Sequence, residues 1–401
     1  MRRVVITGMA VLCSLGSDHN EVFNRLCAKE RILKKIEKNT EPRKSLSTSY
    51  YAPLCDFDDS KYMPKIGQVK RIGSFNSYIA VYSALKAIDD ANIEKLDENT
   101  EVIVGTSTPN INDIGQMLES FENKQKVETL SVQKLMTNAP ASWISTVLGI
   151  HGSSKVVSAA CAAGTESIGM AYQDILLGKT DMAICGGCDY LYDRDFFELK
   201  CFEKLKVITK NIHGYSSPFS KDRSGFMFCE GGSAMLVIEE LDHALARGAE
   251  IYAEITGFES NDDGYSVLSM PEEGTNIINM LKKLIGDKKV DYYNAHGTGT
   301  MLNDKVESYA IQQVFGDKNT QPIINSTKAF VGHTISASGS IEAIVCADSI
   351  RYSKVHGNIS ENIIDNLNYH SETVDIEVKR AVSASFGFGG HNSAIMFEKY
   401  I

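Results

Sequence analysis

Residues 156–177 read VVSAACAAGTESIGMAYQDILL, a short β-branched run followed by a long helical pattern. Apolar residues recur at helical spacing from 168 to 176, Glu166 lies early in the helix, and Gly178 follows as a C-terminal stop. Residues 182–187 then have the composition of another buried strand. This stretch predicts a strand, a helix and a second strand in succession.

The same alternation runs along the whole chain. Short β-branched runs at residues 4–7, 102–105 and 323–326 are each followed by a longer helical pattern. This rhythm is typical of α/β layers whose strands are buried on both faces. The start, MRRVVITGMAVLCSLG, resembles a secretory leader, but Thr7 interrupts the apolar run and no small-residue cleavage site follows, so we expect a buried strand.

Two short echoes indicate two related halves. Residues 3–8 (RVVITG) resemble residues 253–258 (AEITGF), and residues 158–164 (SAACAAG) resemble residues 383–389 (SASFGFG). Because the echoes occur in the same order, we expect two similar halves joined near residues 245–252.

Composition and charge exclude several classes of protein. Of the 401 residues, 43% are hydrophobic and 23% are charged, which is typical of globular domains, and 41 basic against 51 acidic residues give a net charge of −10. A nucleic-acid-binding protein usually has a basic surplus, and no stretch approaches the roughly 18 apolar residues of a membrane helix. The nine cysteines lack paired spacing, which indicates reduced thiols and a cytoplasmic location.

Cys161 is the first candidate for chemistry, because it lies where the strand ends and the helix begins. Small residues on both sides allow a sharp backbone turn and the approach of another molecule. A thiol in the first helical turn faces the positive end of the helix dipole, which favours the thiolate and lowers the pKa. The pattern resembles the nucleophile elbow of hydrolases, and a buried structural cysteine is the alternative.

Two later segments place polar residues after strand-like runs. In NAHGTGT, residues 294–300, His296 precedes glycines and two hydroxyls, which suits either a proton-shuttling imidazole in a channel wall or a loop histidine. In NSTKAFVGH, residues 325–333, Lys328 and His333 lie in a loop, where proteins often display reactive groups. Lys328 is equally compatible with a solvated surface charge.

The segment FGFGGHN, residues 386–392, is rich in glycine and offers backbone N–H groups to an oxyanion; a phosphate cradle is the alternative, but no G-K-[ST] follows. Two metal-site hypotheses are weak. The C-x-x-C at residues 185–188, which closes a predicted strand, has no second pair. Cys161, His296 and His333 have suitable ligand types but no local ligand spacing. We therefore predict no metal site.

Together these segments resemble a β-ketoacyl-acyl-carrier-protein synthase, a condensing enzyme of the thiolase-like superfamily. The resemblance runs nearly end to end, and its most specific parts lie at residues 295–300, 327–333 and 385–390. It implies an α/β fold of five layers, α-β-α-β-α, with two pseudo-symmetric halves and a dimeric assembly. In this reading residues 1–250 carry the nucleophile, and residues 251–401 carry the two histidines and the Phe-Gly gating loop.

The resemblance also implies roles for single residues. Cys161 accepts an acyl group from a carrier thioester; malonyl-carrier then loses carbon dioxide, and its enolate attacks the acyl-cysteine. Neutral His296 and His333 present N–H donors to the malonyl thioester carbonyl. The backbone N–H groups of Cys161 and Phe388 form an oxyanion hole, and Phe388 and Phe386 gate the acyl chain. Thr298 and Thr300 bind the phosphopantetheine arm. Lys328, paired with Glu307, organises the two histidines, and Asp304 supports the site.

The two-histidine arrangement separates subclasses. Chain-initiating relatives resemble Cys-His-Asn, and thiolases carry a second catalytic cysteine near the C-terminus, whereas Cys346 is the last cysteine here. The resemblance therefore implies an elongating 3-oxoacyl-carrier synthase of fatty-acid type, with no cofactor beyond the phosphopantetheine of the carrier. Departures at Ser224, Cys229 and His391 keep open a type II polyketide or aryl-polyene ketosynthase paired with a chain-length factor. A non-catalytic ketosynthase-like partner subunit is a third reading.

The implied partners are an acyl carrier protein and a second subunit, identical or homologous. Lys65, Lys70 and Arg71, near Lys61, form a basic cluster where the resemblance places carrier docking. A solvated helix face is the alternative for this cluster. We expect neither nucleic-acid binding nor membrane insertion.

Overall fold

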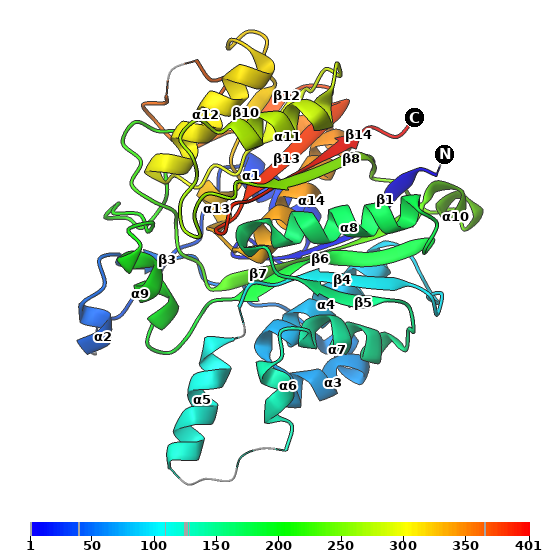
Figure 1. Cartoon of the computed structure of the whole chain (residues 1–401). Helices are drawn as coiled ribbons and strands as arrows, with labels where there is room; N and C mark the ends of the chain where they lie inside the picture. Colours follow the sequence, from blue (N-terminus) through cyan, green and yellow to red (C-terminus); the bar gives the residue numbers. More distant parts are fainter. Residues whose placement is uncertain (1, 39–40, 109, 124–126, 128, 365) are drawn as a thin grey trace.

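The computed structural model describes residues 2–38, 41–108, 110–123, 127, 129–364 and 366–401. Its core is a ten-stranded mixed sheet with the strand order β10-β9-β13-β14-β8-β1-β7-β6-β4-β5 (Figure 1). In chain order these strands are β1 (Val4–Leu12), β4 (Glu101–Gly105), β5 (Ser154–Val157), β6 (Met182–Tyr190), β7 (Gly231–Glu240), β8 (Ala253–Asp262), β9 (Tyr292–Asn294), β10 (Ile323–Asn325), β13 (Arg380–Phe386) and β14 (His391–Glu398).

The sheet consists of two five-stranded halves with one strand order. Outward from the centre, the first half runs β1-β7-β6-β4-β5 and the second runs β8-β14-β13-β9-β10, so strands of the same rank along the chain take the same place. The two halves meet where Val4, Val5 and Ile6 pair antiparallel with β8. The echo between residues 3–8 and 253–258 therefore lies in two equivalent, adjacent strands.

The second echo does not reflect this symmetry, and that part of the sequence argument is wrong. Residues 158–164 follow β5, whose counterpart in the other half is β10. Residues 383–389 belong to the end of β13, whose counterpart is β6. Short runs of small residues recur here because both segments approach the same crowded site, as described below.

Helices form the other three layers. Helices α8 (Ala163–Leu176) and α14 (Ser336–Tyr352) pack together in the middle and contact strands of both halves. Helices α3 (Met63–Ile72), α4 (Phe75–Asp90) and α7 (Ala139–Leu148) cover the outer face of the first half, and α11 (Thr275–Ile285) and α12 (Met301–Phe315) cover that of the second (Figure 1). The predicted five-layer α-β-α-β-α fold is confirmed.

The remaining helices and strands lie around these layers. They are α1 (His19–Cys27), α2 (Glu41–Lys44), α5 (Ile111–Glu122), α6 (Ser131–Leu135), α9 (Phe197–Lys204), α10 (Leu241–Ala246), α13 (Lys328–Val331), the 3-10 turns η1 (Ser60–Tyr62) and η2 (Ala160–Ala162), and the strand pairs β2 (Lys34–Lys35) with β3 (Tyr50–Tyr51) and β11 (Lys354–Val355) with β12 (Val374–Asp375).

The predicted start of the chain and the predicted central helix are both found. All nine residues of β1 are buried, as predicted for a strand covered on both faces. The C-x-x-C is placed differently, because Cys185 and Cys188 lie inside β6 rather than at its end; both are fully buried and unbridged. Within the described residues, no helix has the length and apolar character needed to cross a membrane.

Candidate active site

Cys161 lies in the single turn η2, between β5 and α8. The preceding residue, Ala160, has a φ of +48°, a left-handed conformation that is uncommon for a residue with a side chain. Gly164 is required one turn later, because a Cβ there would lie 2.3 Å from the carbonyl oxygen of Ser336 at the start of α14. The sharp turn predicted from the small neighbours is therefore present, and it holds Cys161 where both central helices begin.

His296 follows β9, and a buried carboxylate on α12 holds its loop. The backbone N–H groups of His296 and Gly297 donate to the two carboxylate oxygens of Glu307, each at 2.8 Å, and the Tyr293 hydroxyl also donates to Glu307. Burial raises the pKa of Glu307 to about 7, while these N–H donors oppose that rise. Glu307 therefore supports the backbone that carries the imidazole.

Lys328 forms its ion pair with Glu342 on α14 and not with Glu307, the partner that the resemblance implied. Both partners of this pair are about 1% exposed. The predicted pair was wrong because Glu307 is already engaged by backbone donors, whereas Glu342 reaches Lys328 only through the packing of α14 against the loop after β10. Lys328 still acts on both imidazoles electrostatically, as shown below.

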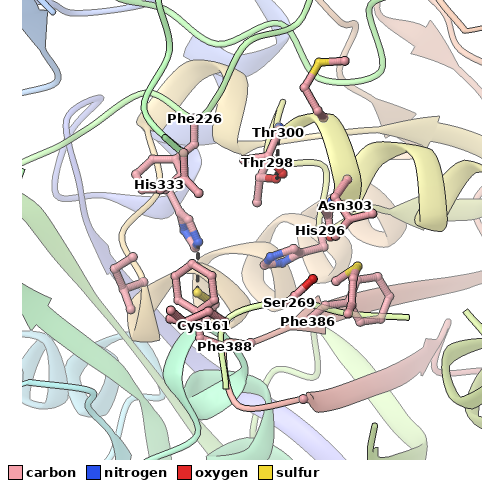
Figure 2. Close-up of a pocket in the computed structure, with 18 of the residues that line it drawn as sticks. Cys161, Phe226, Ser269, His296, Thr298, Thr300, Asn303, His333, Phe386 and Phe388 are labelled. Atoms are coloured by element: carbon pink, nitrogen blue, oxygen red, sulfur yellow. Dashed lines mark hydrogen bonds between the residues drawn. The ribbon is translucent and has the colours of Figure 1, made fainter. Parts of the chain in front are cut away.

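His333 points its ring at the nucleophile. Its Nε2 lies 3.2 Å from the Cys161 sulfur, and its backbone N–H donates to the Met227 carbonyl. The edge of Phe226 packs on the His333 ring with ring centroids 5.1 Å apart. Figure 2 shows His333 and His296 approaching Cys161 from two sides, and the two imidazole centroids are 5.6 Å apart.

These groups converge on one cavity of about 280 Å³. Its wall includes Cys161, both histidines, Thr298, Thr300, Phe386 and Phe388, together with apolar residues such as Phe226, Met270 and Ile335 (Figure 2). A thiol and two imidazoles in a largely apolar cavity are equipped for nucleophilic catalysis on an acyl group.

Burial is the largest influence on the pKa values of the site residues. It raises the pKa of Cys161 to about 12, although Lys328 and the backbone N–H of Phe388 oppose the rise. The predicted lowering of the pKa of this thiol is therefore wrong, because desolvation outweighs the helix dipole. Burial and then Lys328 lower the pKa of both His296 and His333 well below the usual value, so both rings are neutral at pH 7, as expected.

The Phe-Gly loop closes over the nucleophile turn. Phe386 ends β13 and packs its ring on His296 with centroids 5.6 Å apart. A Cβ at Gly387 would lie 2.7 Å from the Ala159 carbonyl oxygen, so only glycine allows this close approach. The N–H of Phe388 then acts on the Cys161 sulfur, as does the N–H of Cys161 itself. Both donors therefore lie close to the sulfur, and their role as an oxyanion hole stays a prediction.

Thr298 and Thr300 lie together in the cavity wall, with their hydroxyl oxygens 2.9 Å apart. Asp304 is fully buried and accepts the backbone N–H groups of Gly299 and Phe219. Thr300 occupies the N-cap position of helix α12 without a side-chain capping hydrogen bond, and Asp304, in the first turn of this helix, supports the threonine loop.

The basic cluster lies apart from these residues. Lys65, Lys70 and Arg71 are on α3, and none of them lines the cavity. Lys70 pairs with Asp59, and Lys61 pairs with Asp89. The docking role of this cluster stays a prediction.

Within the part of the chain that the structure describes, one group of possible metal ligands comes together. The ligand atoms of Cys161, His296 and His333 lie within 4.8 Å of one another and are of the types that zinc prefers. Sequence spacing gave no sign of this group, because its members come from three loops. The prediction that the enzyme works without a metal is untested by this geometry.

Sequence reasoning missed two residues of the site. Glu342 neutralises Lys328, and the Ser338 hydroxyl lies 3.0 Å from Nδ1 of His333. Both are on α14, where nearly every residue is buried, so the sequence pattern does not distinguish polar partners from packing residues. Ser338 and Glu342 are two of several polar residues in this helix, so residue type alone did not single them out.

Alkylation of Cys161 by iodoacetamide is expected to rise about tenfold per pH unit from pH 7 to 10, with no plateau. The thiolate is the nucleophile, and a thiol whose pKa is about 12 gains thiolate steadily over that range. Mass spectrometry of the Cys161 peptide measures the rate, with the exposed Cys201 in the same protein as the internal reference. A plateau near neutral pH would instead show that the helix dipole prevails over burial.

Comparison with known proteins agrees with this geometry. The family model described as "Beta-ketoacyl synthase, N-terminal domain" matches residues 1–244, and "Beta-ketoacyl synthase, C-terminal domain" matches residues 252–361. The chain is 33% identical to 3-oxoacyl-[acyl-carrier-protein] synthase 2 of Staphylococcus aureus (strain COL) over 420 residues, which cover 100% of this chain and 99% of that protein.

Two solved structures share the fold over the full length of both chains. The ishigamide ketosynthase/chain length factor has a TM-score of 0.88 at 27% identity. A type II PKS acyl-carrier protein in complex with its ketosynthase bound to the hexaketide has a TM-score of 0.88 at 25% identity. Fold and site together define a thiolase-like acyltransferase. The chain belongs to the β-ketoacyl synthase family.

Proposed function

We propose that this enzyme elongates acyl chains by decarboxylative condensation of malonyl-carrier with an acyl group held on Cys161. The observation that carries the proposal is the convergence of a thiol and two neutral imidazoles on one cavity. In the first half-reaction the sulfur of Cys161 attacks the acyl-carrier thioester. The N–H groups of Cys161 and Phe388 stabilise the oxyanion, the carrier sulfur leaves, and the proton lost by Cys161 ends on that sulfur.

In the second half-reaction malonyl-carrier occupies the same cavity. Its C–C bond breaks and releases carbon dioxide, while His296 and His333 donate hydrogen bonds to the thioester oxygen that gains enolate charge. The enolate carbon then attacks the acyl carbonyl, and the thiolate of Cys161 leaves. Neutral rings suit this step, because two charged imidazoles with centroids 5.6 Å apart would repel each other.

The surrounding residues position the substrates. We assign Thr298 and Thr300 to the phosphopantetheine arm and Phe386 and Phe388 to gating of the acyl chain. Burial, and then Lys328 in its ion pair with Glu342, lower the pKa of both imidazoles and so keep them neutral. The reaction as written needs no cofactor beyond the phosphopantetheine of the carrier.

A second subunit is part of this proposal. Helix α5 has no buried residue and projects from the body of the molecule beside α6 (Figure 1). Seven large apolar side chains between residues 118 and 136 are exposed: Leu118, Phe121, Val127, Leu130, Val132, Leu135 and Met136. An apolar surface of this kind is typical of a subunit interface, so we propose a dimer, either with an identical chain or with a homologous chain-length factor.

A cytoplasmic location stays a prediction from the sequence.

A type II polyketide or polyene ketosynthase is the second candidate. It is supported by the TM-score of 0.88 with a ketosynthase/chain length factor. Cys229, one of the departures from the family pattern, also touches the site, since its thiol lies 3.2 Å from the His333 carbonyl oxygen. The non-catalytic partner has less support, because Cys161 and both histidines are present and converge.

The deciding experiment incubates the enzyme with malonyl-carrier and a panel of acyl primers and identifies the carrier-bound products by mass spectrometry. Saturated and monounsaturated acyl primers extended by two carbons support fatty-acid elongation. Polyketide or polyene products that require a chain-length-factor subunit support the second candidate. Absence of any β-ketoacyl product with either carrier system or subunit composition contradicts the proposed function.

Charge reversal at Lys70 and Arg71 is expected to raise the KM for the carrier substrate about tenfold, and more at low salt, because acyl carrier proteins are acidic. The matched control is Lys289→Glu/Lys318→Glu, which changes the charge equally at two other exposed lysines. Steady-state kinetics at two salt concentrations measures both variants. Equal KM values for the two double variants would refute the docking role and leave the cluster as a solvated helix face.

A further inference from the structure

A small network of hydroxyl groups lies behind the ring of His333, on the side away from Cys161. The Oγ of Ser338 lies 3.0 Å from Nδ1 of His333 and 3.0 Å from the Thr334 hydroxyl oxygen, and it accepts the Thr334 backbone N–H at 3.1 Å. All three residues are buried, with Ser338 only 3% exposed. Each proton in this network therefore needs a partner inside the protein.

Counting these protons fixes their positions. The hydroxyl of Ser338 has one proton and two lone pairs, and the Thr334 N–H occupies one lone pair. Among the described residues, the Thr334 hydroxyl has Ser338 Oγ as its only hydrogen-bond partner. If Ser338 donated to Thr334, the Thr334 hydroxyl proton would be buried without an acceptor, which costs about 1–3 kcal/mol. The Thr334 hydroxyl therefore donates to Ser338, and Ser338 donates its proton to Nδ1 of His333.

We propose that Ser338 is a positioning residue that fixes His333 as the neutral tautomer with its proton on Nε2. That nitrogen is the one 3.2 Å from the Cys161 sulfur, in the cavity wall. The ring then presents a permanent N–H donor to the reacting groups and does not accept the thiol proton. The link to malonyl decarboxylation rests on the proposed function, whereas the tautomer itself does not.

His296 differs from His333 in this respect. Its Nδ1 is buried and has no hydrogen-bond partner among the described residues. The backbone of His296 is held by Glu307, but no side chain fixes its tautomer. The two imidazoles of this site are therefore not equivalent, and only His333 is committed to one tautomer.

The first test reads the tautomer directly. Long-range ¹⁵N–¹H NMR of the full-length enzyme labelled with ¹⁵N-histidine is expected to show His333 with Nδ1 unprotonated and Nε2 protonated. His333→Ala assigns the resonances. In Ser338→Ala we expect a mixture of both tautomers or exchange broadening. A protonated Nδ1 in the wild-type enzyme would overturn the proposal, and this readout is valid even if the enzyme condenses none of the substrates tested.

The second test separates positioning from folding. Ser338→Ala is expected to keep the rate of acyl transfer to Cys161 within about twofold and to slow malonyl decarboxylation about tenfold, the worth of one hydrogen bond. Ser338→Thr, which keeps the hydroxyl, restores most of the lost rate. The control is Ser340→Ala on the same helix, whose buried hydroxyl has no hydrogen-bond partner among the residues that the structure describes and whose loss leaves both rates unchanged. Equal losses in both half-reactions, or none, would overturn the proposal.

Discussion

Cys161→Ala is expected to lose acyl transfer to the protein and condensation by more than about a thousandfold. Among the described residues that line the cavity, Cys161 supplies the only thiol, its sulfur contacts an imidazole, and alanine leaves no sulfur to form the acyl-enzyme. Radiolabelled acyl-carrier measures the transfer, as label retained on the protein after denaturation. Folding is expected to be preserved, because a small thiol is replaced by a smaller apolar side chain.

The matched control for this variant is Cys201→Ala, which removes an exposed thiol from α9. It is expected to incorporate label at the wild-type rate. Label that persists in Cys161→Ala would place the acyl group on another residue and would remove the basis of the proposed mechanism. An absence of label in the wild-type enzyme with every primer would favour the non-catalytic partner subunit instead.

The catalytic candidates were accessible from sequence because each follows a strand-like run that ends in small or glycine-rich residues. Cys161 follows β5, His296 follows β9 and His333 follows β10, and the parallel pairing of β9 with β10 brings the two histidine loops to one edge of the sheet. Residue type and local pattern therefore identified these side chains as candidates, and the resemblance to β-ketoacyl-acyl-carrier-protein synthases implied that they meet. The resemblance also implied that both imidazoles are neutral, since two charged rings so close together would repel each other.

Properties that depend on packing between distant segments could not be predicted from the sequence. The partner of Lys328 is Glu342, fourteen positions further along the chain, and only the placement of α14 brings the two together. The predicted direction of the Cys161 pKa shift was also wrong. A helix start can be predicted from the sequence, whereas the degree of burial that raises this pKa cannot. Likewise, the hydroxyl of Ser338 acquires its role only from the turn that places Thr334 and His333 against it.

Lys328→Met is expected to lower the free energy of unfolding by about 3–5 kcal/mol, the usual cost of leaving a buried charge without its partner. The change strands the Glu342 carboxylate, which is 1% exposed and already has one oxygen without a hydrogen bond to any described residue. Burial raises the pKa of Glu342 to about 7 even beside Lys328, and removal of Lys328 raises it further.

The sign of the pH dependence follows from this pKa. Between the unfolded pKa of Glu342 and its raised folded pKa, the native state holds a proton that the unfolded state lacks, so the stability of Lys328→Met falls as pH rises. Urea unfolding at pH 5.5 and pH 8 is expected to show a larger deficit at the higher pH. Stability of this variant that is independent of pH would mean that Glu342 is not the stranded group.

The double variant Lys328→Met/Glu342→Met then separates the structural from the chemical contribution of Lys328. Apolar side chains of similar length fill the space of a buried ion pair at little or no net cost, so we expect most of the lost stability to return and the pH dependence to disappear. Decarboxylation is expected to stay at least about tenfold below wild type, because the charge that adds to burial in lowering the pKa of both imidazoles is absent. Full recovery of decarboxylation together with stability would instead reduce Lys328 to a packing element, and the neutrality of the histidines would then rest on burial alone.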